Sequence, residues 1–140
     1  MGDERELTDI TVEELLIRYA NGERDFSYVA IDDGGECLLR GVDLSGINLE
    51  GSYLAVDLSG SILRKANFRY TVWDIARWED IDFSCSDFTR INNGDASYFV
   101  RCNFSNTIWE QADLFQSTFE DCNLTGTNFD DASLAEVRFT

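Results

Sequence analysis

The 140-residue chain contains no histidine and no proline, and the first absence excludes several kinds of function. Histidine is the commonest general base and the commonest zinc ligand in proteins. Without it, the chain can form no histidine-based catalytic triad. We therefore predict a protein that is not an enzyme, with no catalytic residues, no cofactor and no metal site.

Positive charge is scarce, with 11 Lys and Arg against 27 Asp and Glu, for a net charge of −16. Nucleic acids and anionic membranes bind proteins through clusters of Lys and Arg. We therefore expect no nucleic acid and no membrane as a partner, and instead another protein with a basic surface. The charge is uneven, because residues 1–36 carry −8, residues 37–103 carry −2 and residues 104–140 carry −6.

The four cysteines, Cys37, Cys85, Cys102 and Cys122, have no CxxC spacing. The sequence also shows no signal-peptide core and no long apolar run. These features predict a protein of the reducing cytoplasm.

A large apolar residue returns at nearly every fifth position from Cys37 onward, usually with a small residue two positions before it. A period of five fits neither a helix nor an ordinary strand, and sustained repetition of this kind predicts a solenoid. We call this large apolar residue the centre of a repeat, and we interpret Phe26 and Ile31 as two earlier centres. The period is one residue short between Leu54 and Leu58 and one residue long between Asn93 and Phe99, where we expect a bulge near Asn93-Gly94.

The first 25 residues differ from the repeats. Thr11 followed by Glu14 is a capping-box pattern, and Gly22 is a typical helix stop. The spacing predicts a helix over about residues 12–21, which would cover the open first coil. Residues 26–140 then form the solenoid.

The blocks VDLSG, CNFSN, CNLTG and TNFDD resemble those of the pentapeptide repeat family, over nearly the whole chain. The resemblance implies an all-β solenoid, a right-handed quadrilateral β-helix with one pentapeptide on each of four sides, here of about five to six coils. It also implies that the central residue and the small one point inward while the other three point outward. Residues about twenty apart should then stack on neighbouring coils.

Stacking at this spacing suggests several candidate sites. Cys102 and Cys122 are in disulfide range, or are two free thiols in the core. An acidic ladder of Glu110, Asp130 and Asp131 would dock a basic partner, hold a hard cation such as calcium, or simply be solvated. Asp80, Arg101 and Asp121 should form an alternating stack.

The apolar candidates are fewer. Tyr98, Val100 and Phe115 are expected to point outward near one corner, where they would form a protein-interaction patch. Asn93 should stack beside Trp73 and give the indole N–H both room and a partner. The last coil ends at Phe139 without a capping helix, so an end-to-end homodimer through this coil is one expectation.

The resulting prediction is a non-enzymatic structural or protein-interaction module. The alternative is a DNA-mimicking regulator of DNA gyrase or another nucleic-acid-binding protein, since family members that confer quinolone resistance act in that way. The nearly neutral middle of the chain counts against the alternative.

Overall fold

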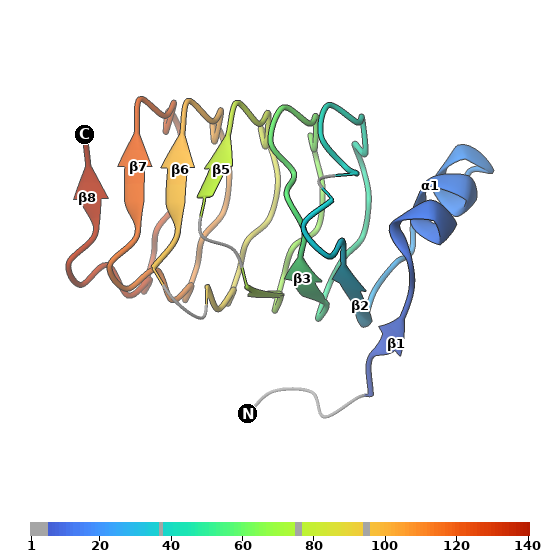
Figure 1. Ribbon diagram of the computed structural model, residues 1–140. Helices are drawn as coiled ribbons and strands as arrows, with labels where there is room; N and C mark the ends of the chain where they lie inside the picture. The colour runs from blue at the N-terminus through green and yellow to red at the C-terminus, as the bar shows by residue number, and fades with distance from the viewer. Residues whose placement is uncertain (1–5, 37, 75–76, 94–95) are drawn as a thin grey trace.

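The computed structural model describes residues 6–36, 38–74, 77–93 and 96–140. Cys37 and Gly94, with its expected bulge, lie outside these ranges. The chain winds into an all-β solenoid of about six turns, and one short helix lies at its N-terminal end (Figure 1). Both the predicted solenoid and its five-to-six-coil length are therefore confirmed.

The regular elements are short and are joined by tight corners. In chain order they are β1 (Thr8–Asp9), α1 (Val12–Ala20), β2 (Val29–Asp32), β3 (Tyr53–Ala55), β4 (Val72–Trp73), β5 (Arg77–Glu79), β6 (Tyr98–Val100), β7 (Thr118–Glu120) and β8 (Arg138–Phe139). They form two four-stranded parallel sheets, ordered β1-β2-β3-β4 and β5-β6-β7-β8.

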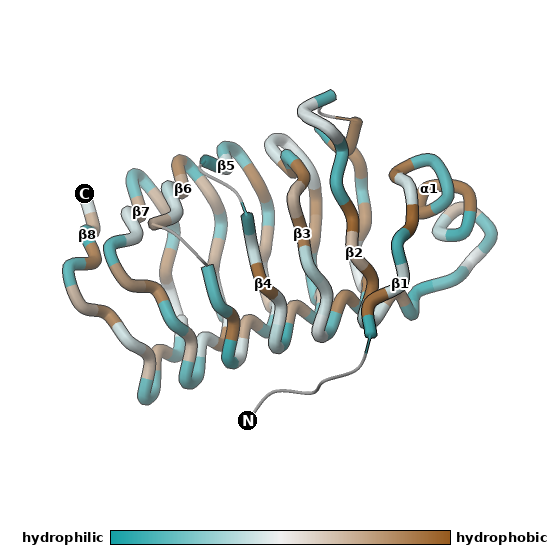
Figure 2. Tube along the Cα trace, turned by 60° about the horizontal axis from the view of Figure 1, so that its bottom comes forward, coloured by the Kyte–Doolittle hydropathy of each residue, from teal (hydrophilic) through white to brown (hydrophobic). Residues whose placement is uncertain are grey.

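The central residues of the repeats stack into four ladders, which define the four faces of the rod. Face A carries Phe26, Leu49, Phe68, Phe88, Trp109 and Phe129; face B carries Ile31, Leu54, Trp73, Asn93, Leu114 and Leu134. Face C carries Leu39, Leu58, Trp78, Phe99, Phe119 and Phe139; face D carries Leu44, Leu63, Phe83, Phe104 and Leu124. In Figure 2 the apolar and polar residues alternate along each coil, as two inward and three outward positions require.

An Asp or Asn precedes about half of the centres and explains why the chain turns there. Its side chain accepts the N–H of the residue after the centre, as Asn48 Oδ1 does from the Glu50 amide at 3.0 Å. Asp82 Oδ1 likewise accepts from the Ser84 amide at 3.0 Å, and Asn128 Oδ1 accepts from the Asp130 amide at 2.8 Å. An Asx side chain that satisfies a nearby amide stabilises a turn. An Asp or Asn therefore stabilises the turn, although Ile62 and Ile108 occupy the same position in other coils.

Most corner residues, two positions after a centre, lie in the left-handed region; Asp33 and Val56, at the edge between faces B and C, do not. Among the described residues, thirteen non-glycine residues have a positive φ, and all occupy this position. Ser52 N donates to Leu49 O at 3.1 Å, so the turn starts at the centre and its third residue, Gly51, has φ +70°. That is the pattern of a type II turn. At Gly51 a Cβ would also collide with the Tyr28 ring.

Aromatic rings fill the interior of the middle coils. Phe83 and Phe104 stack at a centroid distance of 5.1 Å, and Phe88 stacks on Trp109 at 4.2 Å. Both early centres, Phe26 and Ile31, are 1% exposed, as predicted. The core therefore runs continuously from the first coil, and burial of the centres declines from Leu124, at the end of the fifth coil, onward.

Coil length varies on one side only. The step from face B to face C spans eight residues from Ile31 to Leu39, four from Leu54 to Leu58 and six from Asn93 to Phe99. The steps around the other three corners are all five residues. The two predicted slips of the period therefore fall at the same edge of the rod.

Helix α1 covers the first coil. Thr11 Oγ1 accepts the Glu14 amide at 3.0 Å, which confirms the predicted cap, and Leu15 is buried against the core. The Tyr19 hydroxyl donates to Ser45 O at 2.7 Å and fixes the helix on the coil. The helix ends at Ala20, one residue before the prediction, because Asn21 is its C-cap. In the described part of the chain, no helix is long and apolar enough to cross a membrane.

Candidate protein-interaction surface

The acidic ladder lies on face A in the last two coils. The Gln111 amide donates to Asp130 O at 2.9 Å, and this register places Glu110 beside Asp130, with Asp131 at the adjacent corner. All three side chains are exposed. Among the described residues, no group of three or more carboxylates or thiols has a geometry that could hold a metal ion. The calcium alternative thus gains no support.

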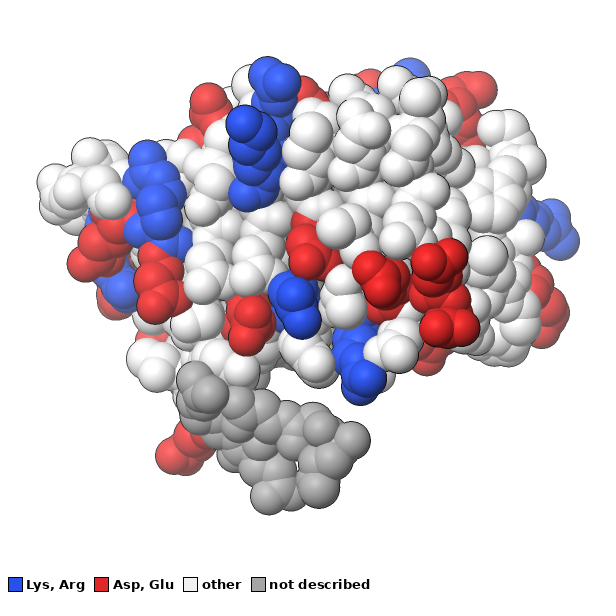
Figure 3. Space-filling model, turned by 180° about the vertical axis from the view of Figure 1, so that it is seen from behind, with Lys and Arg blue, Asp and Glu red and all other residues white. Residues whose placement is uncertain are grey.

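Basic side chains precede the ladder on the same face. Arg69 and Arg90 lie two coils and one coil below it, and their guanidinium carbons lie 6.0 and 5.9 Å from the Tyr70 ring centroid. Arg69 Nη1 is 3.6 Å from Asp87 Oδ2. In the view from behind, basic side chains lie over the middle of the rod and acidic ones toward its C-terminal end (Figure 3). Sequence analysis missed this basic strip, although the twenty-residue spacing contained the signal.

A second charged group lies on face C. Arg101 donates from Nε and Nη2 to Asp80 at 2.8 and 3.1 Å, and from Nη2 to Glu79 at 3.0 Å. These bonds lower the pKa of Asp80 and raise that of Arg101. The predicted alternating stack thus contains an ion pair between Arg101 and Asp80.

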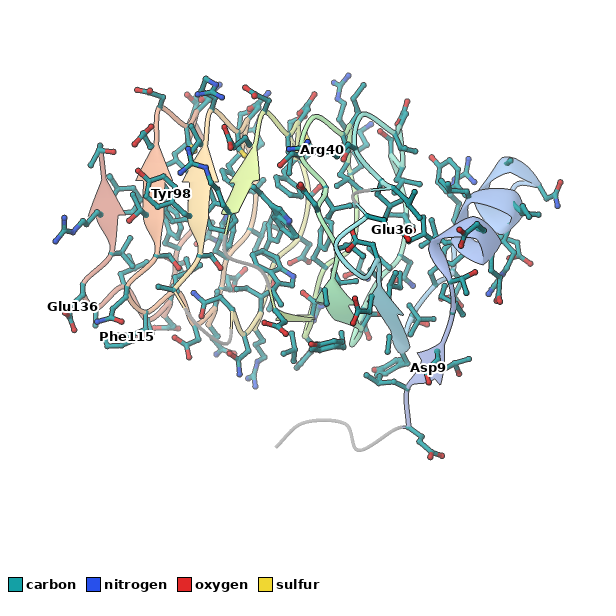
Figure 4. All side chains as sticks on the ribbon, in the orientation of Figure 1. Asp9, Glu36, Arg40, Tyr98, Phe115 and Glu136 are labelled. Atoms are coloured by element: carbon teal, nitrogen blue, oxygen red, sulfur yellow. The ribbon has the colours of Figure 1, made fainter. Side chains whose placement is uncertain are left out.

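The predicted aromatic patch is not a single patch. Tyr98 is half-buried, and its hydroxyl donates to Glu120 Oε1 at 2.5 Å, which raises the pKa of Tyr98. Phe115 is 44% exposed, but it lies on face B, whereas Tyr98 lies on face C (Figure 4).

Val100 was expected to point into solvent, and that expectation is wrong, because the residue is 0% exposed. It pairs in register with Glu79 and Glu120 on the two neighbouring strands. Their longer side chains are held over the sheet by Arg101 and Tyr98 respectively. A valine between them is covered even at an outward position.

The stacked cysteines are free thiols in this structure. Cys102 is 2% exposed, and both the neighbouring Cys122 thiol and burial raise its pKa. Cys85 is exposed at a corner of the rod. Thiolates are the reactive form of cysteine, so the buried thiol is the less reactive one.

Asn93 lies beside Trp73 on face B, as the spacing predicts. Its amide nitrogen, however, donates to Ser117 Oγ at 2.6 Å. Within the described residues the Trp73 indole nitrogen has no hydrogen-bond partner. The expected bond between the two is therefore wrong, because Ser117 in the following coil binds the asparagine amide.

The sixth coil is less covered than the others. Leu134 is 37% and Phe139 51% exposed. Phe139 stacks on Phe119 of the preceding coil at 5.3 Å, so one side of its ring is packed.

Comparison with known proteins agrees with this geometry. The chain matches the family profile for pentapeptide repeats, in eight copies over residues 36–69, 97–134 and 112–140. A search of curated proteins gave no match. Among solved structures, a pentapeptide repeat protein from the Arabidopsis thaliana thylakoid lumen is 26% identical, covering 74% of this chain and 72% of that one, with a TM-score of 0.53.

Two further structures are less similar. A pentapeptide repeat protein from Nostoc PCC 7120 is 19% identical, with 97% of this chain and 100% of that chain covered and a TM-score of 0.33. QnrB1, a plasmid-mediated fluoroquinolone resistance protein, is 12% identical, with 81% and 70% covered and a TM-score of 0.41.

Proposed function

Because the chain belongs to the pentapeptide repeat family, we propose that it is a non-enzymatic module that binds another protein. Proteins of this family are typically structural or interaction modules. The observation that carries the proposal is the exposed ladder of Glu110, Asp130 and Asp131 on a regular face. Neighbouring strands lie about 4.8 Å apart, so the stacked coils present Glu110 and Asp130 at a regular spacing that a partner can recognise.

Chemistry at the ladder is not part of the proposal. General acid–base catalysis needs a group with a tuned pKa within reach of a bound substrate, commonly in a site that excludes water. The ladder carboxylates are exposed instead. Exposed carboxylates are suited to attracting a basic surface, because their charge steers association and sets its salt dependence.

Crosslinking in extracts of cells that contain the protein tests this proposal. The triple variant Glu110→Gln, Asp130→Asn, Asp131→Asn removes the ladder charge, and we expect it to lose crosslinks to any partner that uses face A. A control with the same charge change neutralises three exposed acids elsewhere, namely Glu6, Asp9 and Glu36. Equal loss or equal retention of partners in the two variants would refute a specific role for the ladder.

A DNA-mimicking regulator is the second candidate, and the net charge of −16 favours it. Residues 37–103 carry only −2, so the acidic surface is interrupted in the middle of the rod. Inhibition of gyrase supercoiling at micromolar concentration is the assay. No inhibition would remove gyrase from the candidates.

We further propose a cytoplasmic location and an end-to-end homodimer through the sixth coil. The location is supported by composition alone. Cell fractionation tests it, and recovery in a thylakoid fraction, the location of the Arabidopsis protein, would contradict it. The homodimer is supported by the exposed Leu134 and Phe139, whose apolar surface a second coil would cover.

A further inference from the structure

The charge of the side chains on face A changes from basic to acidic along the rod, and this reversal carries a further inference. The backbone bonds Tyr70 N to Thr89 O, Arg90 N to Glu110 O and Gln111 N to Asp130 O, of 3.0, 2.9 and 2.9 Å, fix the order of coils. Arg69 therefore belongs to the third coil, Arg90 to the fourth, Glu110 to the fifth and Asp130 to the sixth. Two coils that carry Arg69 and Arg90, with Asp87 beside Arg69, are followed by two coils whose charges on this face are all acidic.

The basic half is open to a partner. The Arg69 side chain is 43% exposed, and its contact with Asp87 is a loose one at 3.6 Å. Arg90 is exposed, and Tyr70, which lies between the two guanidinium groups, is 40% exposed. The ring offers apolar contact area between the two charges, of the kind that interfaces use.

The charges of an antiparallel second copy are complementary to this pattern coil by coil. A two-fold axis placed between the coils of Arg90 and Glu110 exchanges the third coil with the sixth and the fourth with the fifth. Arg69 then faces Asp130 of the other copy, and Arg90 lies within reach of Glu110. Because the contact is isologous, each pair occurs twice.

We propose that two copies of this chain pair side by side and antiparallel through face A. The inference rests on the proposed protein-binding role of the acidic ladder and names a second copy as its partner. A partner with a uniformly basic surface would gain from Glu110 and Asp130 but would be repelled by Arg69 and Arg90. Only an inverted pattern satisfies both halves, and the chain itself carries that pattern.

The pairing should be weak and sensitive to salt. Exposed ion pairs contribute about 0–1 kcal/mol each, and the net charge of both copies opposes association. At ~0.1 M salt the Debye length is about 10 Å, so distant repulsion is screened while the facing pairs are not. High salt, on the order of 1 M, should weaken the pairs themselves.

Sedimentation velocity on charge-reversed variants tests the proposal. Arg90→Glu places two acidic groups opposite each other, and Glu110→Arg places two basic groups opposite each other. Each should weaken the dimer about tenfold or more, because the altered contact occurs twice. An equimolar mixture of the two variants should associate about as well as the original chain, since the heterodimer contains only opposite-charge pairs.

Matched reversals away from face A serve as controls. Glu36→Arg and Arg40→Glu change the net charge by the same amounts at exposed positions (Figure 4), and they should leave the dimer unchanged. Far-ultraviolet circular dichroism checks that all variants fold. A glutamate at position 90 keeps a backbone conformation that Glu136 already adopts, with φ +58° against +57° for Arg90.

Three results would overturn the inference. They are a chain that remains monomeric at ~0.1 M salt up to millimolar concentration, a mixture of the two variants that fails to associate, and a dimer broken by Phe139→Asp but not by Arg90→Glu. Under any of them the crosslinking comparison of ladder and control variants still stands. The failure of this inference is thus separable from the failure of the proposed function.

Discussion

Replacing Phe104 with alanine should destabilise the protein far more than replacing Phe139. Phe104 is 0% exposed and contacts rings in its own coil and in both neighbouring coils, including Phe83 at 5.1 Å and Phe119 at 5.6 Å. Phe139 is 51% exposed and contacts the rings of Phe119 in the preceding coil and Phe129 in its own coil. The two variants delete the same atoms, so the difference reports position in the rod.

The expected magnitudes follow from burial. A buried Phe→Ala change costs about 3–5 kcal/mol, because the lost transfer free energy and the cavity add. Full burial of a phenylalanine side chain is worth roughly 1.5–3 kcal/mol, and Phe139 is about half buried, so its loss should cost about 1 kcal/mol. A typical domain has a free energy of unfolding of about 5–15 kcal/mol, so both variants should remain folded.

Urea unfolding, followed by fluorescence of Trp73, Trp78 and Trp109, measures the difference. The midpoint should fall clearly for Phe104→Ala and slightly for Phe139→Ala, with Phe104→Leu in between. Equal losses would contradict the reasoning, because they would mean that the sixth coil is as tightly packed as the fourth. A separate early transition in Phe104→Ala would instead mean that the coils unfold as independent units.

Three shorter predictions concern charge, thiols and the open coil. Arg101 lowers the pKa of Asp80 in the folded state. The stabilisation is therefore present above the unfolded-state pKa of Asp80 and is lost as the pH falls through its folded-state pKa. Arg101→Gln should thus make the thermal stability depend less on pH in the acidic range. Ellman's reagent should react with Cys85 faster than with Cys102, and the opposite order would contradict the burial of Cys102. If the end-to-end homodimer forms, Phe139→Asp should abolish it in light scattering, whereas an unchanged mass would exclude the sixth coil as the contact.

The repeating backbone could be predicted from the sequence because its causes are local. An Asp or Asn before the centre, as at Asn48, satisfies an amide two residues later, and this bond depends on no distant residue. The cap at Thr11 is local in the same sense. The order of coils then follows from counting, which is why the stacking of Glu110 beside Asp130 could be anticipated.

The surface could not be predicted as well, because exposure depends on side chains from neighbouring coils. Val100 occupies an outward position and is nevertheless covered, since Glu79 and Glu120 are held in place by residues up to 22 positions away. The hydrogen bond of Asn93 likewise depends on a serine 24 residues along the chain. The period determines whether a side chain points inward or outward. Whether an outward side chain is exposed depends on the side chains of the neighbouring coils.

The edge between faces B and C has a consequence for how this chain tolerates change. Every difference in coil length, from four to eight residues between centres, is absorbed there. An insertion at this edge therefore leaves the order and spacing of charges on face A unaltered. A peptide or reporter domain grafted between the exposed residues Gly34 and Gly35, in the eight-residue step, should extend from this edge without changing the spacing of the coils on face A.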